Sequence, residues 1–264
     1  MTAPPLSQIS SSTILRCHDE LVDACERGDI ERVREIIPWT MPTLNDGYAL
    51  SMAALFGHVD CVSELLTVKH MSKYAGRAMA YAVKPNRHQC VAVLAPLADE
   101  EYFQKSLLFA AQWGCKETLV CLLQHTCRYD YLSKSVEHAA QHGQVEAINI
   151  LLQNVCLDAN DVNTALAAAV KYGHDTCVEI LAPLSNPALD HNRALLECFM
   201  STAFNDNIFR VLFALGDARA ALQQLRTERA WDTKKIEHIA QYIDRETLRM
   251  AVAKHGCEGA GRKI

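Results

Sequence analysis

The chain has 264 residues, of which half are apolar and 22% are charged, so it is not a chain that is disordered throughout. Its formal net charge of −5 argues against a dedicated nucleic-acid binder. No apolar run reaches the roughly 18–20 residues that a membrane-spanning helix needs, so we expect neither nucleic acid nor membrane as a partner.

The first thirteen residues, MTAPPLSQISSST, are rich in Pro and Ser. They lack the charged start and apolar core of a secretory signal. We therefore interpret residues 1–13 as a flexible leader, and we expect Ser12 or Thr13 to cap the first helix.

A unit of 28–30 residues then repeats six times, and each copy has a residue suited to a tight turn. These turn residues are Gly28, Gly57, Asn86, Gly114, Gly143 and Gly173. Asn is the substitution expected where the backbone needs a positive φ. Alanine precedes each turn residue by four positions: Ala24, Ala53, Ala82, Ala110, Ala139 and Ala169.

Apolar residues stand five and eight positions after each turn residue, the spacing of a buried helical stripe. They are Val33 and Ile36, Val62 and Leu65, Val91 and Leu94, Leu119 and Leu122, Ile148 and Leu151, and Val178 and Leu181. Each unit is therefore predicted to be two short antiparallel helices around a turn. Neither helix buries its apolar face alone, so the copies are expected to stack into a solenoid.

The segments AALFGHVDCVSELL (53–66), AAQWGCKETLVCLL (110–123), AAQHGQVEAINILL (139–152) and AAVKYGHDTCVEIL (168–181) resemble ankyrin repeats. The resemblance covers residues 14–184 as six repeats and implies an all-α, ankyrin-type helical-repeat solenoid. The period is shorter than the usual one of about 33 residues. The Thr-Pro-Leu-His opening and the Gly-Ala-Asp hairpin are absent, so we predict plain loops in place of the β-hairpins and no real sheet.

The repeat pattern weakens after Leu181. Residues 199–213 keep Asn205 near a turn and Ile208, Val211 and Leu212 in the second helix. Residues 218–229, 234–244 and 245–256 read as three more helices, with Asp232 or Thr233 as a cap and Gly256 as an end. We interpret 185–256 as degenerate repeats and a helical cap, and 257–264 as a flexible tail.

The cysteines and histidines favour packing over chemistry. Cys61, Cys90 and Cys177 occupy a position that holds Thr118 or Ala147 in other units, which is typical of a small core slot. His58 and His174 follow the turn glycine, where the ankyrin resemblance implies a hydrogen bond that supports the loops. His138 and His142 have metal-ligand spacing, but no Glu follows the first of them, and His138 matches the packing positions of Met52, Tyr81 and Phe109. We predict no metal, no cofactor and no enzymatic activity.

The residue types one and two places before each turn residue vary too much between units for positions in a hydrophobic core. The ankyrin resemblance places them at the end of the inner helix, on the concave face that contacts partners. From this series we select Phe56, Trp113, His142, Tyr172, Lys84, Gln112, Gln141 and Lys171 as partner-binding residues. Exposed aromatics are unusual unless a partner covers them, and packing of the rings on neighbouring repeats is the alternative. Tyr102, Phe103, Tyr129 and Tyr131 form a second candidate patch in the inter-repeat loops 98–106 and 127–135, unless those rings staple one loop to the next.

These features predict a protein–protein interaction module that binds a protein or peptide, apolar or acidic in character, through the concave face. The alternative is an effector or enzyme in which the repeats direct the protein to its target and the C-terminal helices carry the activity. A C-terminal part that stacks in register favours the first function, and a separate domain with a polar pocket favours the second. Eleven cysteines without a disulfide framework place the protein in the cytosol, or in a host cytosol if it is a secreted effector, and we expect a monomer.

Overall fold

The computed structural model describes residues 10–125, 129–154, 157–186, 193–200, 205–215, 221, 223, 237 and 239–247. The chain divides into two compact units, Met1–Leu157 and Asp158–Ile264. Residues 1–9 of the predicted leader, the predicted tail 257–264, and the residues Asp232, Thr233 and Gly256 lie outside the described residues.

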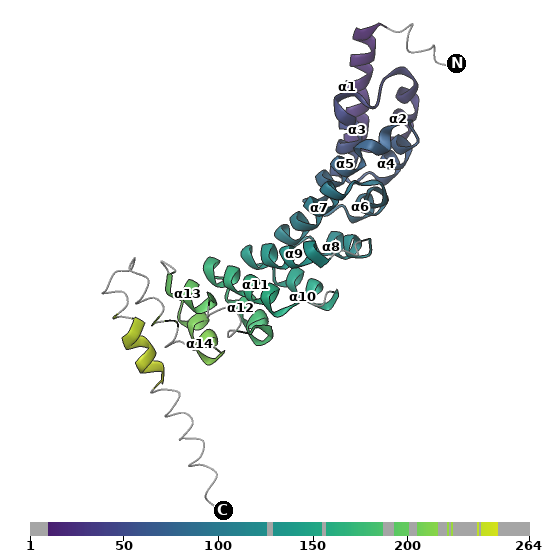
Figure 1. The fold of residues 1–264 in the computed structure, drawn as a ribbon. Coiled ribbons are helices and arrows are strands. Elements are labelled where there is room, and N and C mark those ends of the chain that lie inside the picture. Colours follow the sequence, from purple (N-terminus) through teal and green to yellow (C-terminus); the bar gives the residue numbers. More distant parts are fainter. Residues whose placement is uncertain are drawn as a thin grey trace, which may run out of the picture. The chain divides into compact units, whose positions relative to one another are not determined.

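The first unit is a double row of helices (Figure 1). The inner helices are α1 (Ser11–Arg27), α3 (Leu44–Phe56), α5 (Ala75–Val83), α7 (Glu100–Trp113) and α9 (Tyr129–Gln141). The outer helices are α2 (Ile30–Ile36), α4 (Val59–Leu66), α6 (His88–Leu94), α8 (Lys116–Leu123) and α10 (Val145–Asn154). Each inner helix packs on the next inner helix and each outer helix on the next outer one, which is the predicted solenoid.

All six predicted turn residues have a positive φ, between 58° at Asn86 and 88° at Gly57. The residue after each turn donates its backbone N–H to the carbonyl of the alanine four places before the turn, over 2.9–3.0 Å. These bonds satisfy a carbonyl that the end of the inner helix leaves free. Asn86 adds contacts that glycine lacks, because its Oδ1 accepts hydrogen bonds from the backbone N and the Oγ1 of Thr118 in the next repeat.

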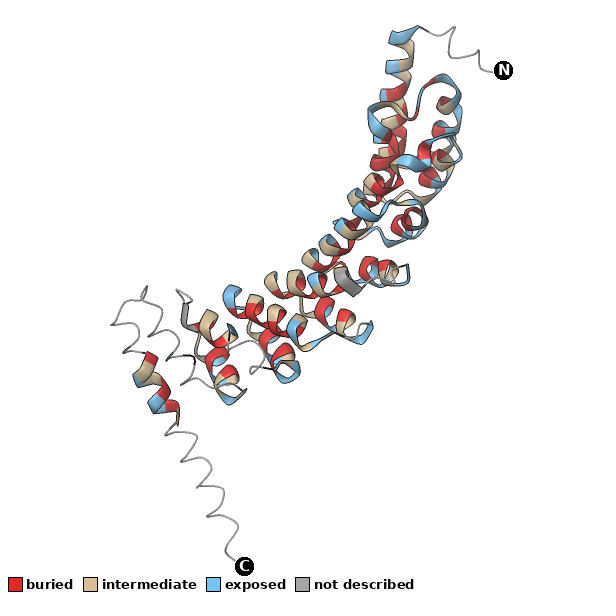
Figure 2. Cartoon of the chain, viewed as in Figure 1, coloured by how far each residue is buried: buried red, intermediate tan, exposed pale blue. Residues whose placement is uncertain are grey.

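The core lies between the two rows of helices (Figure 2). The six alanines of the inner helices are fully buried, and so are the apolar residues predicted for the outer helices, with Ile36 the most exposed of them at 4%. Cys61, Cys90 and Cys177 are buried beside them, which confirms their packing role. Burial raises the pKa of the Cys90 thiol to about 11, so this side chain is a protonated core residue rather than a nucleophile at neutral pH.

One hydrogen bond between neighbouring repeats recurs with three different donors. The Nε2 atom of His58 donates to the carbonyl of Glu26 over 3.0 Å, as the histidine position predicts. Arg87 and Cys115 occupy the same place in the next two repeats. Their Nε and Sγ atoms donate to the carbonyls of Leu55 and Lys84 over 3.3 and 3.7 Å. The bond, rather than the residue type, is therefore the repeated feature.

The segments between repeats differ from their prediction in detail. Short 3-10 helices, η2 (Ile37–Trp39), η3 (Met71–Tyr74) and η4 (Ala95–Leu97), follow outer helices or lead into inner ones, and the described residues contain no strand. The assignment of residues 98–106 to a loop is wrong from Glu100 onward, where α7 begins, and residues 129–135 likewise belong to α9. Asp99 caps α7 by accepting a hydrogen bond from the backbone N of Tyr102, which explains the early start.

Two tyrosines at the starts of successive repeats pack on glycines of the preceding inner helix. A Cβ atom placed on Gly47 would lie 2.8 Å from the Cβ of Tyr74, and one on Gly76 would lie 2.8 Å from the Cβ of Tyr102. These close approaches require glycine. Tyr102 in α7 therefore packs on α5 of the preceding repeat, and a contact between the rings of the two predicted loops stays a prediction.

The first helix begins slightly earlier than predicted. Ser10, and not Ser12 or Thr13, is the N-cap of α1, and its side chain accepts a hydrogen bond from the backbone N of Thr13 over 3.2 Å. Ser10 alone adopts the extended backbone that an N-cap needs, with φ −65° and ψ 145°.

His18 in α1 is a source of pH-dependent stability. Its side chain is 1% exposed and neither ring nitrogen has a hydrogen-bond partner among the described residues. Burial lowers the pKa of His18, and Asp19 opposes that shift only in part. The unfolded chain therefore binds a proton at this site at a higher pH than the folded chain does.

We expect the folded state to lose stability as the pH falls below about 6.5, where the unfolded histidine takes up its proton. His18→Leu removes this site. Urea unfolding between pH 7.5 and 5 should show a smaller loss of stability in the variant than in the wild type. An equal loss in both would mean that other groups control the acid sensitivity.

The second unit repeats the same packing. It contains α11 (Ala159–Tyr172), α12 (Asp175–Leu181), η5 (Ala182–Leu184), α13 (Arg193–Met200) and α14 (Asp206–Leu215). Helix α13 packs on α11 and α14 packs on α12, so the helices after Leu181 continue the stack in register. Asn205 caps α14 as its Oδ1 accepts from the backbone N of Asn207 and Ile208.

The last described segment, 239–247, is one continuous helix. The expected break between 244 and 245 is therefore wrong, because no Gly or Pro interrupts the helical pattern there. Tyr242 of this segment lies edge-on against Phe209 of α14, with 4.9 Å between the ring centroids.

Candidate functional site

The candidate site is the solvent-facing side of helices α3, α5, α7 and α9 in the first unit. Positions nine, five, two and one before each turn fall on one side of an inner helix, because residues four and three apart are neighbours on a helix surface. We call this face the inner-helix surface. Its aromatic, proline and charged or amide members are Tyr48, Phe56, Arg77, Tyr81, Lys84, Pro85, Lys105, Phe109, Gln112, Trp113, Lys134, His138, Gln141 and His142.

The predicted aromatic residues of this surface are open to solvent. Phe56 is 43% exposed and Trp113 is 48% exposed, values that are high for large apolar side chains. Packing of these rings on neighbouring repeats, the alternative, is therefore partial, and a large part of each ring stays accessible.

Two further aromatics were missed as site residues. Tyr81 and Phe109 were assigned to packing, but they are 37% and 43% exposed. Tyr81 stands four residues before Pro85, and Phe109 stands four residues before Trp113. Residues four apart are neighbours on a helix surface, so the two members of each pair lie on the same face. The packing assignment is confirmed for Met52, which is 5% exposed, and is wrong for Tyr81 and Phe109.

The polar members differ in how firmly they are held. The Nζ atom of Lys84 lies 4.4 Å from the centroid of the Trp113 ring, a cation–π contact between α7 and the end of α5. Gln112 and Gln141 are half-buried. His142 donates from Nδ1 to the carbonyl of His138 over 2.9 Å, and the two rings are parallel with centroids 6.4 Å apart.

The four-residue spacing of His138 and His142 thus fits a hydrogen bond at the end of α9. No group of three or more His, Cys, Asp or Glu side chains suited to a metal ion occurs in the described part of the chain. Likewise, none of the described helices has the length and apolar character needed to cross a membrane.

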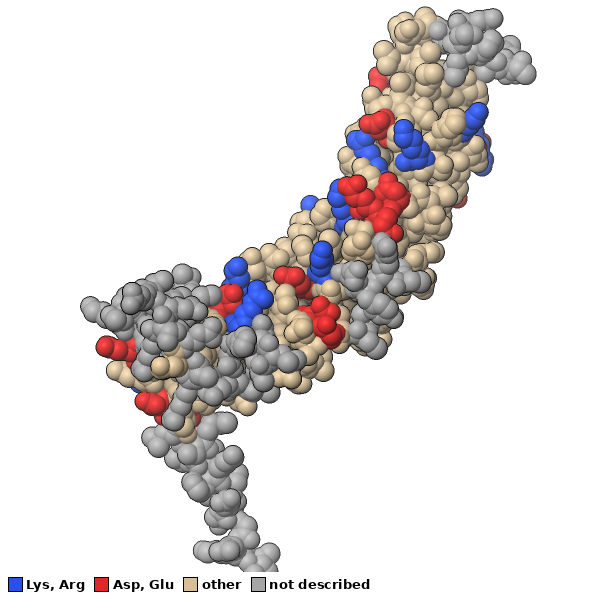
Figure 3. All heavy atoms as spheres, viewed as in Figure 1, with Lys and Arg blue, Asp and Glu red and all other residues tan. Residues whose placement is uncertain are grey.

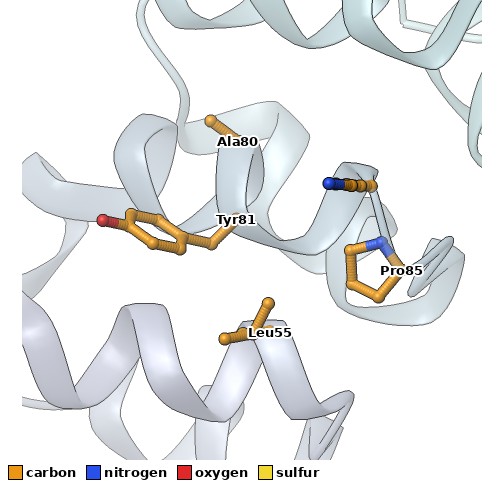
Figure 4. Close-up of a pocket in the computed structure, with 5 residues that line it drawn as sticks. Leu55, Ala80, Tyr81 and Pro85 are labelled. Atoms are coloured by element: carbon orange, nitrogen blue, oxygen red, sulfur yellow. The ribbon is translucent and has the colours of Figure 1, made fainter. Parts of the chain in front are cut away.

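A pocket of 480 Å³ opens on the inner-helix surface between α3 and α5. Its lining is mostly carbon, from Leu55, Ala80, Tyr81 and Pro85, and Lys84 is its one charged lining residue. Figure 4 shows Leu55 pointing from α3 into the space between Tyr81 and Pro85. The volume lies within the range of about 300–1,000 Å³ typical of ligand pockets.

Acidic and basic side chains are interspersed on the face shown in Figure 3. On the inner-helix side, Arg77 pairs with Asp46 over 3.3 Å, and Lys105 pairs with Glu101 over 2.5 Å. The hydrogen bond from Lys105 lowers the pKa of Glu101. These cations are therefore balanced within the protein.

Two of the predicted residues belong to the second unit. Tyr172 is 50% exposed, and the Nζ of Lys171 lies 5.8 Å from the centroid of its ring. The alignment of Tyr172 with Phe56 and Trp113 along one ridge stays a prediction, since the residues lie in different units.

Residues 107–194 match the family model of ankyrin repeats, as three copies. The fold is similar to that of the crystal structure of the human ASB11 ankyrin repeat domain, with a TM-score of 0.59 and 18% sequence identity. The match covers 74% of this chain and 96% of that chain. No curated protein sequence matches the chain.

The paired helices and the positive-φ turns have the ankyrin-repeat fold, and the family match shows ankyrin repeats in residues 107–194. Ankyrin repeats are in general protein–protein interaction modules, and the fold is typically a scaffold for binding rather than for catalysis.

Proposed function

We propose that the first unit binds a partner protein or peptide on its inner-helix surface. One observation supports this most: four large aromatic side chains at two repeated positions, Phe56, Tyr81, Phe109 and Trp113, are more than a third exposed. Aromatic side chains in this setting are expensive to leave in water and are the usual anchors of protein interfaces.

The second candidate, an activity in the C-terminal helices, has less support. Helices α13 and α14 continue the stack of α11 and α12 instead of starting a separate fold around a polar pocket. This favours an interaction module without enzymatic activity. For the whole protein we propose a cytosolic monomer, the compartment being supported by cysteines that are free in the described part of the chain.

Site-specific cross-linking tests the proposed surface. We expect a photo-reactive phenylalanine analogue at Phe109 to cross-link a protein in an extract of the source cells. The same analogue at Val120, on α8, is the matched control, since Val120 is 42% exposed and lies on an outer helix. Cross-links from position 120 alone, or the same products from both positions, would contradict the proposal.

A further inference from the structure

The pocket between α3 and α5 has features that define the chemistry of its occupant. We infer that it receives an apolar side chain of the partner and that Lys84, at its rim, binds an Asp or Glu carboxylate next to that side chain in the partner sequence. This inference rests on the proposed function and adds a specificity to one part of the inner-helix surface.

The apolar part of the inference comes from the lining. Leu55 enters from α3, Ala80 and Tyr81 come from α5, and Pro85 follows α5, so the lining that two repeats supply to this open pocket is mostly carbon (Figure 4). Such a lining offers few hydrogen bonds to a polar group, and burying an unpaired polar group is costly. An aliphatic or aromatic side chain is the occupant that this lining favours.

The acidic part comes from Lys84. Among the described residues, no carboxylate forms an ion pair with its ammonium group, whereas Arg77 of the same helix is paired with Asp46. The Trp113 ring holds one side of the ammonium group, with Nζ 4.4 Å from the ring centroid. A cation fixed at the rim in this way loses less conformational freedom when an anion binds it.

The hydrogen-bond acceptors at the adjoining helix ends are already used. Arg87 Nε donates to the carbonyl of Leu55 over 3.3 Å, and Cys115 Sγ donates to the carbonyl of Lys84 over 3.7 Å. These carbonyls therefore offer little to a donor from a partner. Lys84 and Arg87 also repel a basic group, so the local charge favours a carboxylate over an ammonium or guanidinium group.

Selection from a phage-displayed library of random twelve-residue peptides tests this specificity. The wild-type protein should enrich peptides in which a large apolar residue stands within two positions of Asp or Glu. Lys84→Glu should lose that acidic preference and favour Lys or Arg instead, while keeping the apolar residue. Lys69→Glu is the charge-matched control, because Lys69 is exposed in the segment after α4, and it should behave as the wild type.

A synthetic copy of one enriched peptide should bind Lys84→Glu about fivefold or more weakly than the wild type, the scale of an exposed ion pair. Lys84→Met keeps the apolar stem over Trp113 and should weaken binding less than the charge reversal does. Because Lys84 is exposed, thermal melting should show both variants folded.

Three outcomes would overturn the inference in distinguishable ways. Enriched peptides without an acidic preference, or with the same preference in Lys84→Glu, contradict the role of Lys84 and leave the proposed function standing. Enriched peptides that bind a folded Tyr81→Ala/Trp113→Ala double variant as tightly as the wild type contradict the proposed function itself, because Tyr81 lines the pocket and both rings belong to the inner-helix surface. A library from which no peptide is enriched contradicts both.

Discussion

Gly28→Ala is expected to destabilise the protein by about 3–5 kcal/mol, whereas Gly173→Ala costs only about 1 kcal/mol. The two glycines have nearly the same backbone conformation, with φ of 75° and 76°. A left-handed conformation costs a non-glycine residue about 1 kcal/mol at either position. The difference must therefore come from what the new methyl group meets.

At Gly28 the added Cβ would lie 2.3 Å from Nδ1 of His58, and His58 is held by its hydrogen bond to the carbonyl of Glu26. Overpacking adds about 1–3 kcal/mol, and a lost hydrogen bond adds about 1 kcal/mol. At Gly173 no described atom lies within 4 Å of the added Cβ.

Urea unfolding of both variants measures this difference. A double-mutant cycle isolates the cause, since in a His58→Ala background Gly28→Ala should cost about as much as Gly173→Ala does in the wild type. Equal losses of stability for the two glycine variants in the wild-type background would mean that the His58 side chain moves aside at little cost. The repeated hydrogen bond between repeats would then contribute little to the free energy of unfolding.

The repeat architecture could be predicted from the sequence because its constraints are local. A turn residue at positive φ accepts Gly or Asn and little else, so the series from Gly28 to Gly173 marks the turns without any tertiary information. The buried alanine and the Val and Leu stripe follow from fixed offsets within a helix. Burial of Cys61, Cys90 and Cys177 follows for the same reason.

The boundaries and the inter-repeat contacts could not be predicted equally well. The Asp99 cap moves the start of α7 into the segment read as a loop, and the choice of Ser10 over Ser12 depends on backbone geometry. The bond from Arg87 to the carbonyl of Leu55 is made by a residue type that the ankyrin pattern does not require. Such contacts are visible only once the repeats are stacked.

The candidate site was predicted in part. The mixture of residue types at the position before the turn correctly marks Phe56 and Trp113 as exposed. A mixture of residue types also occurs at the position of Tyr81 and Phe109, where the corresponding residue of another unit is His138. That mixture could have indicated that the rings of Tyr81 and Phe109 are exposed. The pocket and the contact between Lys84 and Trp113 join side chains of neighbouring repeats, and no offset within one unit predicts them.

Replacing Phe56 or Trp113 by Ala should weaken partner binding by at least about 2 kcal/mol each, roughly thirtyfold in Kd. Each ring is more than two-fifths exposed, so its removal leaves the repeat core intact and the cost in stability is small. Tyr172→Ala extends the test to the second unit. A loss of binding there would support the three-ring ridge, and unchanged binding would confine the site to the first unit.

The most direct test of the inner-helix surface is the Kd of the protein cross-linked from position 109, measured for the wild type, for Phe56→Ala/Trp113→Ala and for Val120→Ala, with a melting curve for each. We expect the double variant to bind at least about thirtyfold more weakly while its Tm stays within about 2 °C of the wild type, and Val120→Ala to match the wild type in binding. A double variant that melts far below the wild type would show that the rings pack the fold. A double variant that folds and binds as the wild type does would place the binding surface elsewhere and contradict the account.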